Sequence, residues 1–195
     1  MKIRAALTAL FLLITPAVAA NINNGGNFNY VNSQTLTSGT ATSLTAGKAI
    51  LSNTTAASVV VPTFTVNTSQ GGYLTPKLML WTNATSGWSG GQVQVDLWGY
   101  APTFTNGDGG NYAVATGSAN NGFLGSLTCT FGGVVGSANL GQAGDGAYAE
   151  CVPNQGTVLV PTYATSFTFY WTLVSLSTLT KASGQTFQIY GGIIN

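Results

Sequence analysis

Side chains able to do acid–base or metal chemistry are few in this chain of 195 residues. It contains no His, five Lys and Arg, and four Asp and Glu. Without His, the commonest general base and metal ligand are missing, and Ser–His–Asp or Cys–His catalysis is excluded. The carboxylates are Asp96, Asp108, Asp145 and Glu150.

A glycosidase needs two carboxylates on either side of the sugar bond. Asp145 and Glu150 are the nearest such pair in sequence, but three of the four acids lie in turn or strand positions that favour solvation. Asp96 falls on the polar phase of its expected strand, and Asp108 and Asp145 lie in glycine-rich turns. We therefore predict a protein that is not an enzyme and needs no cofactor.

The lysines give no better catalytic candidate. A Ser–Lys dyad requires a desolvated lysine, whereas Lys48 follows Ala-Gly, Lys77 follows a proline and Lys181 precedes a polar turn. None of the three is predicted to be buried. Calcium is the best metal candidate, because Asn106, Asp108 and Asn111 form a small oxygen-rich turn. One carboxylate makes a weak cage, and a plain hairpin turn is the alternative.

Two residue types remain. Cys129 and Cys151 are the only cysteines, and in an exported protein they are expected to form one disulfide.

Of the aromatics, Trp88 lies in a Gly- and Ser-rich segment, where we expect it to be exposed, and Tyr100 lies nearby. Exposed Trp and Tyr rings stack on sugars, whereas most aromatics of a β-sandwich pack in the core.

The first twenty residues predict a secretory signal peptide. Lys2 and Arg4 precede an uncharged apolar run, and Ala17-Val18-Ala19 gives the small–x–small pattern of a cleavage site. The run is shorter than the roughly 20 apolar residues of a membrane-spanning helix, so we expect no membrane span in the mature chain. Cleavage after Ala19 and cleavage after Ala20 fit equally well.

Export would leave a nearly neutral chain. The mature part keeps three lysines and four acids, hence a net charge of 3 − 4 = −1, and contains no Arg. Nucleic-acid binding depends on clustered cations, so no nucleic-acid partner is predicted. Three Asn-x-Ser/Thr sites, at Asn53, Asn67 and Asn83, matter only in a host that glycosylates this motif.

The rest of the chain has the two-residue period of β-strands. Apolar residues alternate with polar ones in several short runs, for example Val93–Val95–Leu97, Leu127–Cys129–Phe131 and Phe167–Phe169–Trp171–Leu173. Glycine- and asparagine-rich turns separate these runs. We predict an all-β fold: a single antiparallel β-sandwich of jelly-roll type over 48–195, after a flexible arm or poorly paired first strand over 21–47.

Two further expectations follow from the strand pattern. Cys129 is in phase with core residues of its strand, and Cys151 is in phase with Ala147 and Ala149, so a bridge between neighbouring or facing strands is sensible. The segment Ser166–Leu176 is uncharged and strongly β-prone. It must be central or covered, by its own sheet or by another subunit, because exposed it would aggregate.

Seven short segments follow one another along the chain: Leu44–Ile50, Ser58–Pro62, Gly71–Leu78, Val95–Trp98, Ala101–Asp108, Gly122–Gly125 and Gly184–Ile189. This ordered series resembles a group of structural proteins of tailed-phage virions. The likeness spans roughly 44–195, which is most of the mature chain, and no single segment is diagnostic. The resemblance implies a β-sandwich component of decoration or tail-associated type, and it brings no catalytic residues.

The expected function is therefore that of an exported, non-enzymatic structural protein, which self-associates or binds other structural proteins. Such a product could be virion-associated, periplasmic, extracellular or on the cell surface. A signal peptide departs from ordinary virion proteins, which assemble in the cytoplasm. The alternative is a secreted surface or glycan-binding β-sandwich module that uses exposed aromatics such as Trp88 and Tyr100.

Overall fold

The computed structural model describes residues 28–66, 72–83, 88, 90–115, 122–135, 146–155, 158–160 and 166–194. The predicted signal peptide, Asn67 and Asp145 lie outside these residues. The described part is built from strands, and its one helical element is the short 3-10 turn η1 (Ala56–Ser58). The expected all-β class is confirmed.

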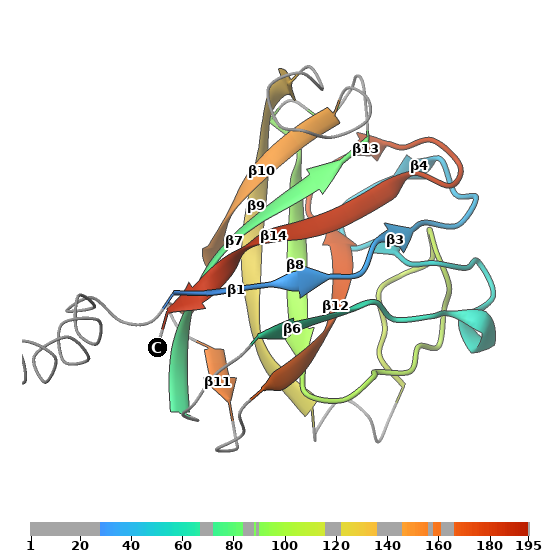
Figure 1. The fold of residues 1–195 in the computed structure, drawn as a ribbon. Helices are drawn as coiled ribbons and strands as arrows, with labels where there is room; N and C mark the ends of the chain where they lie inside the picture. The colour runs from blue at the N-terminus through green and yellow to red at the C-terminus, as the bar shows by residue number, and fades with distance from the viewer. Residues whose placement is uncertain are drawn as a thin grey trace, which may run out of the picture.

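The strands of the molecule are seen in Figure 1. In chain order they are β1 (Phe28–Tyr30), β2 (Asn32–Ser33), β3 (Leu36–Thr37), β4 (Ser43–Leu44), β5 (Ala49–Ile50), β6 (Thr63–Val66), β7 (Gly72–Thr82), β8 (Gln92–Trp98), β9 (Phe123–Val135), β10 (Gly146–Pro153), β11 (Val158–Val160), β12 (Phe167–Ser175), β13 (Leu179–Thr180) and β14 (Thr186–Ile194).

One antiparallel 12-stranded sheet contains every strand except β4 and β13, which pair with each other. Its main path runs β1-β14-β7-β10-β9-β8-β12-β6-β2. The path contains nested pairs: β8 with β9, then β7 with β10, then β6 with β12, then β1 with β14. The chain thus folds back on itself around the segment that joins β8 to β9.

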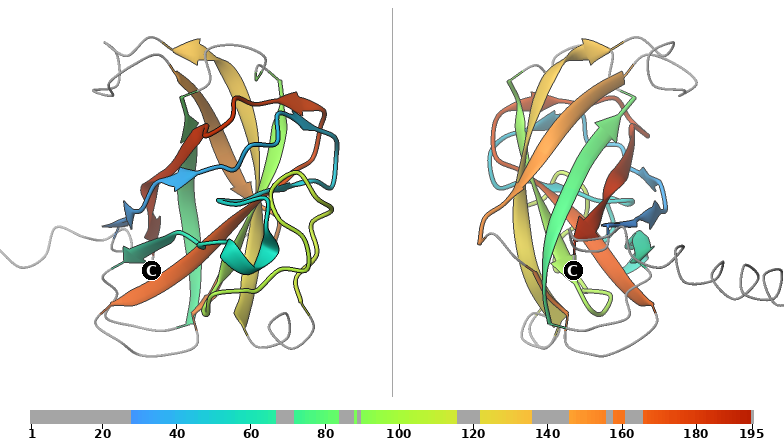
Figure 2. Two further views of the ribbon diagram at one scale, coloured as in Figure 1. Left: turned by 90° about the vertical axis from the view of Figure 1, so that its right-hand side faces the viewer. Right: turned by 60° about the vertical axis from the view of Figure 1, so that its left-hand side comes forward.

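The sheet curls into a sandwich-like body with two layers (Figure 2). One layer contains β14, β7 and β10, and the other contains β9, β8 and β12. The N-terminal strands connect the two ends of the sheet, because β1 pairs with β14 whereas β2, two residues later, pairs with β6. Strands within the predicted arm, 21–47, are therefore paired from Phe28 onward.

The core lies between the two layers, where the predicted alternation places it. Buried side chains include Val93, Val95 and Leu97 of β8, Leu127, Cys129 and Phe131 of β9, and Phe169, Trp171 and Leu173 of β12. Strand β12 lies between β8 and β6. The aggregation-prone segment Ser166–Leu176 is thus covered by its own sheet, which was one of the two expected alternatives, the other being cover by another subunit.

The segment between β8 and β9 covers part of the outer face of the sheet. Phe104 packs with Ala49 and Leu51 in a second, smaller apolar cluster, against which Tyr112 also packs. A bridge between Lys48 and Asn111 attaches the same segment to the residues before β5. This cover explains why residues on the outward phase of β8 are buried, which alternation alone does not predict.

Candidate functional site

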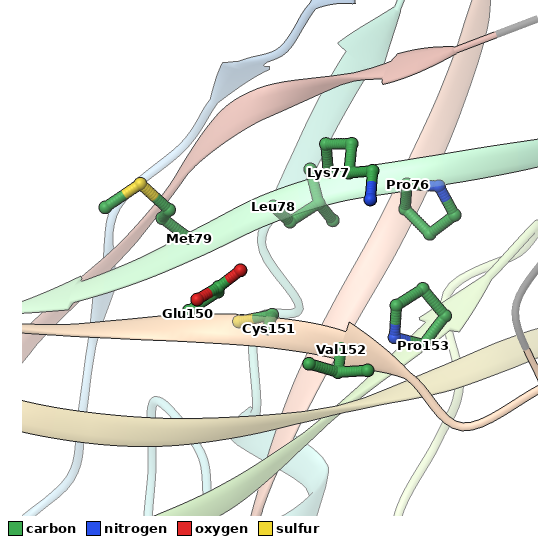
Figure 3. A pocket seen from close by; sticks show the side chains of 8 residues that line it. All are labelled: Pro76, Lys77, Leu78, Met79, Glu150, Cys151, Val152 and Pro153. Carbon is green, nitrogen blue, oxygen red and sulfur yellow. The ribbon is translucent and has the colours of Figure 1, made fainter.

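A groove lies on the outer face of β7 and β10 among the described residues. It is lined by Pro76–Met79 of β7 and Glu150–Pro153 of β10 and has a volume of about 340 Å³; we call it the β7–β10 groove (Figure 3). Leu78 is directly opposite Cys151, and Met79 is directly opposite Glu150. Leu78 and Cys151 face the core, so their neighbours on each strand point outward into the groove.

Two prolines explain why the sheet is hollowed here. Strand β10 pairs with β7 over Leu78–Thr82, and β11 pairs with β7 over Gly72–Leu74. Between these stretches, described pairing of β7 is on one side only, with β14. Pro76 lies in this gap and Pro153 ends β10. Proline has no N–H to donate to a neighbouring strand, which suits it to such a position.

The groove combines exposed apolar side chains with one cation and one anion. Met79 is 41% exposed and Val152 is 60% exposed. Lys77 and Glu150 are exposed, and the ion pair found among the described residues involves neither of them. Figure 3 shows their charged ends apart, on different strands. The groove therefore offers both signs of charge beside apolar surface.

An aromatic row continues the outer face beyond the groove. Tyr190 of β14 is opposite Met79, and Tyr148 of β10 is opposite Trp81. The Tyr148 and Tyr190 rings lie 6.3 Å apart, centre to centre, and burial raises the pKa of both hydroxyls. A Cβ on Gly146 would collide with the Trp81 indole, so a glycine is needed where β10 passes that ring.

The predicted disulfide is confirmed and lies beneath the groove. Cys129 and Cys151 are opposite each other on the adjacent strands β9 and β10, with Cα atoms 4.0 Å apart. Both are buried. The bond thus joins the two strands that flank the segment 136–145, which contains Gly136, Gly141 and Gly144.

Asp108 and Lys181 are not the solvated turn residues that the sequence indicates. Their side chains are fully buried and form an ion pair of 3.0 Å. Asp108 also accepts hydrogen bonds from the backbone N–H groups of Ala41 and Leu51, and Lys181 donates to the carbonyl of Gly39. Lys181 comes from a segment distant in sequence, so no local pattern could reveal this pairing. The two residues join three parts of the chain.

The expected calcium turn is not assembled as a set of oxygen ligands. Asp108 is engaged by Lys181 and two amides, as described above. Asn111 Oδ1 accepts a hydrogen bond from Lys48 Nζ at 2.9 Å, and Asn106 Nδ2 donates to the carbonyl of Asn111. Within the described residues, no group of three His, Cys, Asp or Glu could hold a metal ion.

Asp96 is also buried, contrary to its predicted solvated position. Gln94 Nε2 donates to its Oδ1 at 2.6 Å, and the Tyr112 hydroxyl is a second hydrogen-bonding partner. Burial raises the pKa of the Asp96 carboxyl, against the effect of these hydrogen bonds. Burial and then the Asp96 charge raise the pKa of Tyr112. Of the described carboxylates, only Glu150 is exposed.

The prediction of an exposed Trp88 is wrong. Its side chain is 0% exposed and packs edge-on against Phe131 and Phe187, with ring centres 4.9 and 5.6 Å away. The Gly- and Ser-rich context does not reveal this burial, because the contacts come from distant strands. A surface role for Trp88 is thereby removed.

Tyr100, in contrast, is 72% exposed. It lies next to Gly122, where a Cβ would be 3.5 Å from the tyrosine ring. Phe123 follows and is 48% exposed, with its ring packed edge-on against Trp98. Tyr100 and Phe123 thus both expose aromatic surface at the end of β8 and the start of β9.

The β7–β10 groove itself was not expected. Leu78 and Cys151 face the core, and the residues on either side of each must point outward in a strand. The outward orientation of the groove side chains could therefore be found from sequence. These side chains are Lys77, Met79, Glu150 and Val152. What sequence does not provide is the pairing of β7 with β10, which are separated by two other strands of the chain.

Comparison with known proteins adds no relative: no protein-family model, no curated protein and no solved structure matches this chain. In the part of the chain that the structure describes, no helix has the length and apolar character needed to cross a membrane.

Proposed function

We propose that this chain is an exported, non-enzymatic structural protein that acts through contacts with other protein subunits, as a decoration or tail-associated component of a phage particle does. The observation that carries the proposal is the placement of its reactive groups. Asp108 and Lys181 neutralise each other in the interior, Asp96 is covered by Tyr112, and the cysteines are joined. These groups hold the scaffold.

The strand connectivity supports the same proposal. Strands β8, β9 and β10 lie side by side in the sheet, and β7 lies beside β10, which is the strand order of a Greek key. The pairs β6 with β12 and β1 with β14 extend this Greek key on its two sides. This arrangement favours a jelly roll, an architecture of about eight strands that is common in viral capsid and lectin domains. The ordered segments that resemble phage virion proteins add the preference for a particle.

Export is the second part of the proposal. A disulfide persists in oxidising compartments and is rare in a reducing cytosol. The Cys129–Cys151 bond therefore supports passage out of the cytoplasm, in agreement with the signal peptide that the first twenty residues predict.

Mass spectrometry of purified particles and of culture supernatant tests this function. We expect the processed chain, beginning at Ala20 or Asn21, in particles at a fixed ratio to the other structural proteins. Recovery in the supernatant or host envelope alone, with clean particles, would contradict the proposal. A chain that retains residues 1–20 would contradict the export step.

A glycan-binding module is the second candidate, and the exposed Tyr100 favours it. Its ring and that of Phe123 offer aromatic surface at one end of the sheet, and aromatic faces are suited to stacking on sugar rings. A glycan array would compare wild type with Tyr100→Ala and, as a matched control, Tyr190→Ala. Binding that Tyr100→Ala abolishes and Tyr190→Ala retains would support this candidate, and equal signals from all three would remove it.

A further inference from the structure

The two exposed charges of the described residues share one groove. Lys48 is half-buried and donates to Asn111, and the other described charges, Asp96, Asp108 and Lys181, are buried. Lys77 and Glu150 remain, with opposite signs, in the β7–β10 groove. The other exposed side chains that the structure describes are uncharged, so this placement favours a partner with the same two charges in complementary positions.

We propose that the β7–β10 groove is a self-complementary interface at which two copies of this chain meet face to face. The inference deepens the proposed function and rests on it, because it names the subunit contact through which a structural protein would act. The partner is a second copy, because the groove contains both a cation and an anion. Each charge of one copy can therefore be neutralised by the opposite charge of the other.

The positions of the outward side chains support a two-fold arrangement. Side chains opposite each other on antiparallel strands are about 5 Å apart, and those two residues apart on one strand are about 7 Å apart. Met79 and Glu150 are such an opposite pair. Lys77 and Val152 are the next outward residues along β7 and β10, beyond the last described pairing of these strands, and they complete a four-cornered array that we call the square. In order around it they are Lys77, Val152, Glu150 and Met79.

The charged residues occupy one diagonal of this square, and the apolar residues occupy the other. A two-fold axis that lies in the interface along the apolar diagonal places Met79 on Met79 and Val152 on Val152 of the second copy. The same rotation brings Lys77 over Glu150 of the second copy and Glu150 over Lys77 of the second copy. An isologous interface requires this self-complementarity.

The surroundings of the square fit an interface as well. Met79 and Val152 are among the exposed large apolar side chains of the described residues, and the hollow beside them can receive the corresponding side chains of the second copy. Tyr190 flanks Met79 on β14, and aromatic residues are enriched in interface cores. Thr128 and Thr130 of β9, opposite Val152 and Glu150, provide an uncharged polar rim.

Sedimentation velocity of charge-reversal variants tests the proposal. Lys77→Glu makes the groove wholly acidic and Glu150→Lys makes it wholly basic, so each variant alone should dimerise about tenfold or more weakly than wild type. An equal mixture of the two should form heterodimers as strong as the wild-type dimer. The double variant, Lys77→Glu with Glu150→Lys, should also dimerise. Lys48→Glu is the matched control and should leave dimerisation unchanged.

Three outcomes overturn the interface. The wild-type chain could remain monomeric through the whole concentration series, the single variants could dimerise like wild type, or the mixture could fail to recover. Circular dichroism of each variant verifies that the exposed substitutions leave the fold intact. The result is independent of the particle experiment: a chain absent from particles that shows the reversal and recovery loses the phage role but keeps the interface.

Discussion

The molecule places opposite charges in two contrasting regions. In the interior, Asp108 and Lys181 form an ion pair with no exposed side-chain surface and with backbone partners on both sides. In the β7–β10 groove, Lys77 and Glu150 are exposed and are not in contact with each other. In a chain so poor in charge, the first region stabilises the fold and the second region is open to a partner.

The contrast shows how location determines what the same chemistry does. A buried charge without its partner is strongly destabilising, whereas an exposed charge contributes little to the stability of a monomer. Removal of the interior residues should therefore affect unfolding, and removal of the groove residues should affect association. The following experiments test that division, from the largest expected effect to the smallest.

Breaking the interior pair should have the largest effect. Asp108→Ala leaves the Lys181 charge buried and unpaired, and Lys181→Ala leaves the Asp108 charge buried and unpaired. Each should lower the free energy of unfolding by about 3–5 kcal/mol, measured by urea denaturation followed by tryptophan fluorescence. Lys48→Ala, which removes the hydrogen bond from a half-buried lysine to Asn111, is the control. A loss below about 1 kcal/mol, the value typical of surface pairs, would show that the pair is not essential to the interior.

The aromatic residues provide a second comparison between interior and surface. Trp88→Ala should lower the free energy of unfolding by about 3–5 kcal/mol, because it leaves a large cavity against Phe131 and Phe187. Tyr100→Ala should change it by no more than about 0.5 kcal/mol. The same denaturation series measures both. Equal effects would mean that Trp88 is not packed as described.

The disulfide lies between the two regions, inside the sheet but directly under the groove. Replacing both Cys129 and Cys151 by Ala removes a link between residues separated by 22 positions. In the chain-entropy account the loss is about 3 kcal/mol. Wild type in a reducing agent should approach the stability of the double variant. An unchanged denaturation midpoint in the double variant and in the reduced wild type would contradict this prediction.

Asp96 is a buried carboxyl that has no cation partner among the residues that the structure describes. The pH dependence of stability should reveal it. Burial places its folded-state pKa above the ordinary value of 3.8, so the folded chain binds more protons than the unfolded chain between the two values. Stability should therefore fall as pH rises from 3.8 through the folded-state pKa. Asp96→Asn should remove this fall, and Glu150→Gln, a change at an exposed carboxylate, should retain it. Parallel slopes for all three would contradict the burial of a titrating carboxyl.

The smallest effect on unfolding is expected in the groove. Lys77→Ala and Glu150→Ala should each change the free energy of unfolding by no more than about 0.5 kcal/mol at concentrations where the chain is monomeric. A loss comparable with that of Asp108→Ala would show that the groove charges belong to the scaffold, and would erase the contrast between the two regions.

Local pattern was enough to predict several of the longer strands, such as β8, β9 and β12, and the inward phases of their residues. Val93, Val95 and Leu97 are buried as alternation requires, and Cys129 lies in phase with them in the core. Such predictions succeed because the two-residue period of a strand depends on its own backbone. The disulfide followed from the same phase argument and from the count of cysteines.

The residues that were misplaced depend on contacts distant in sequence. Asp96 is buried because Tyr112 covers the outward phase of β8, and Trp88 is buried because Phe131 and Phe187 surround it. A single strand carries no information about what packs over it. The groove escaped prediction for the same reason, since it requires the pairing of β7 with β10.

The most direct measurement of face-to-face association is a zero-length cross-link between two copies. Isotope-labelled and unlabelled chains are mixed and treated with a carbodiimide, which joins a lysine amine to a carboxylate only when the two are in contact. The account predicts a mixed-isotope peptide that links Lys77 of one copy to Glu150 of the other. A reaction that yields links within single chains only, or joins copies through other residues, would contradict it.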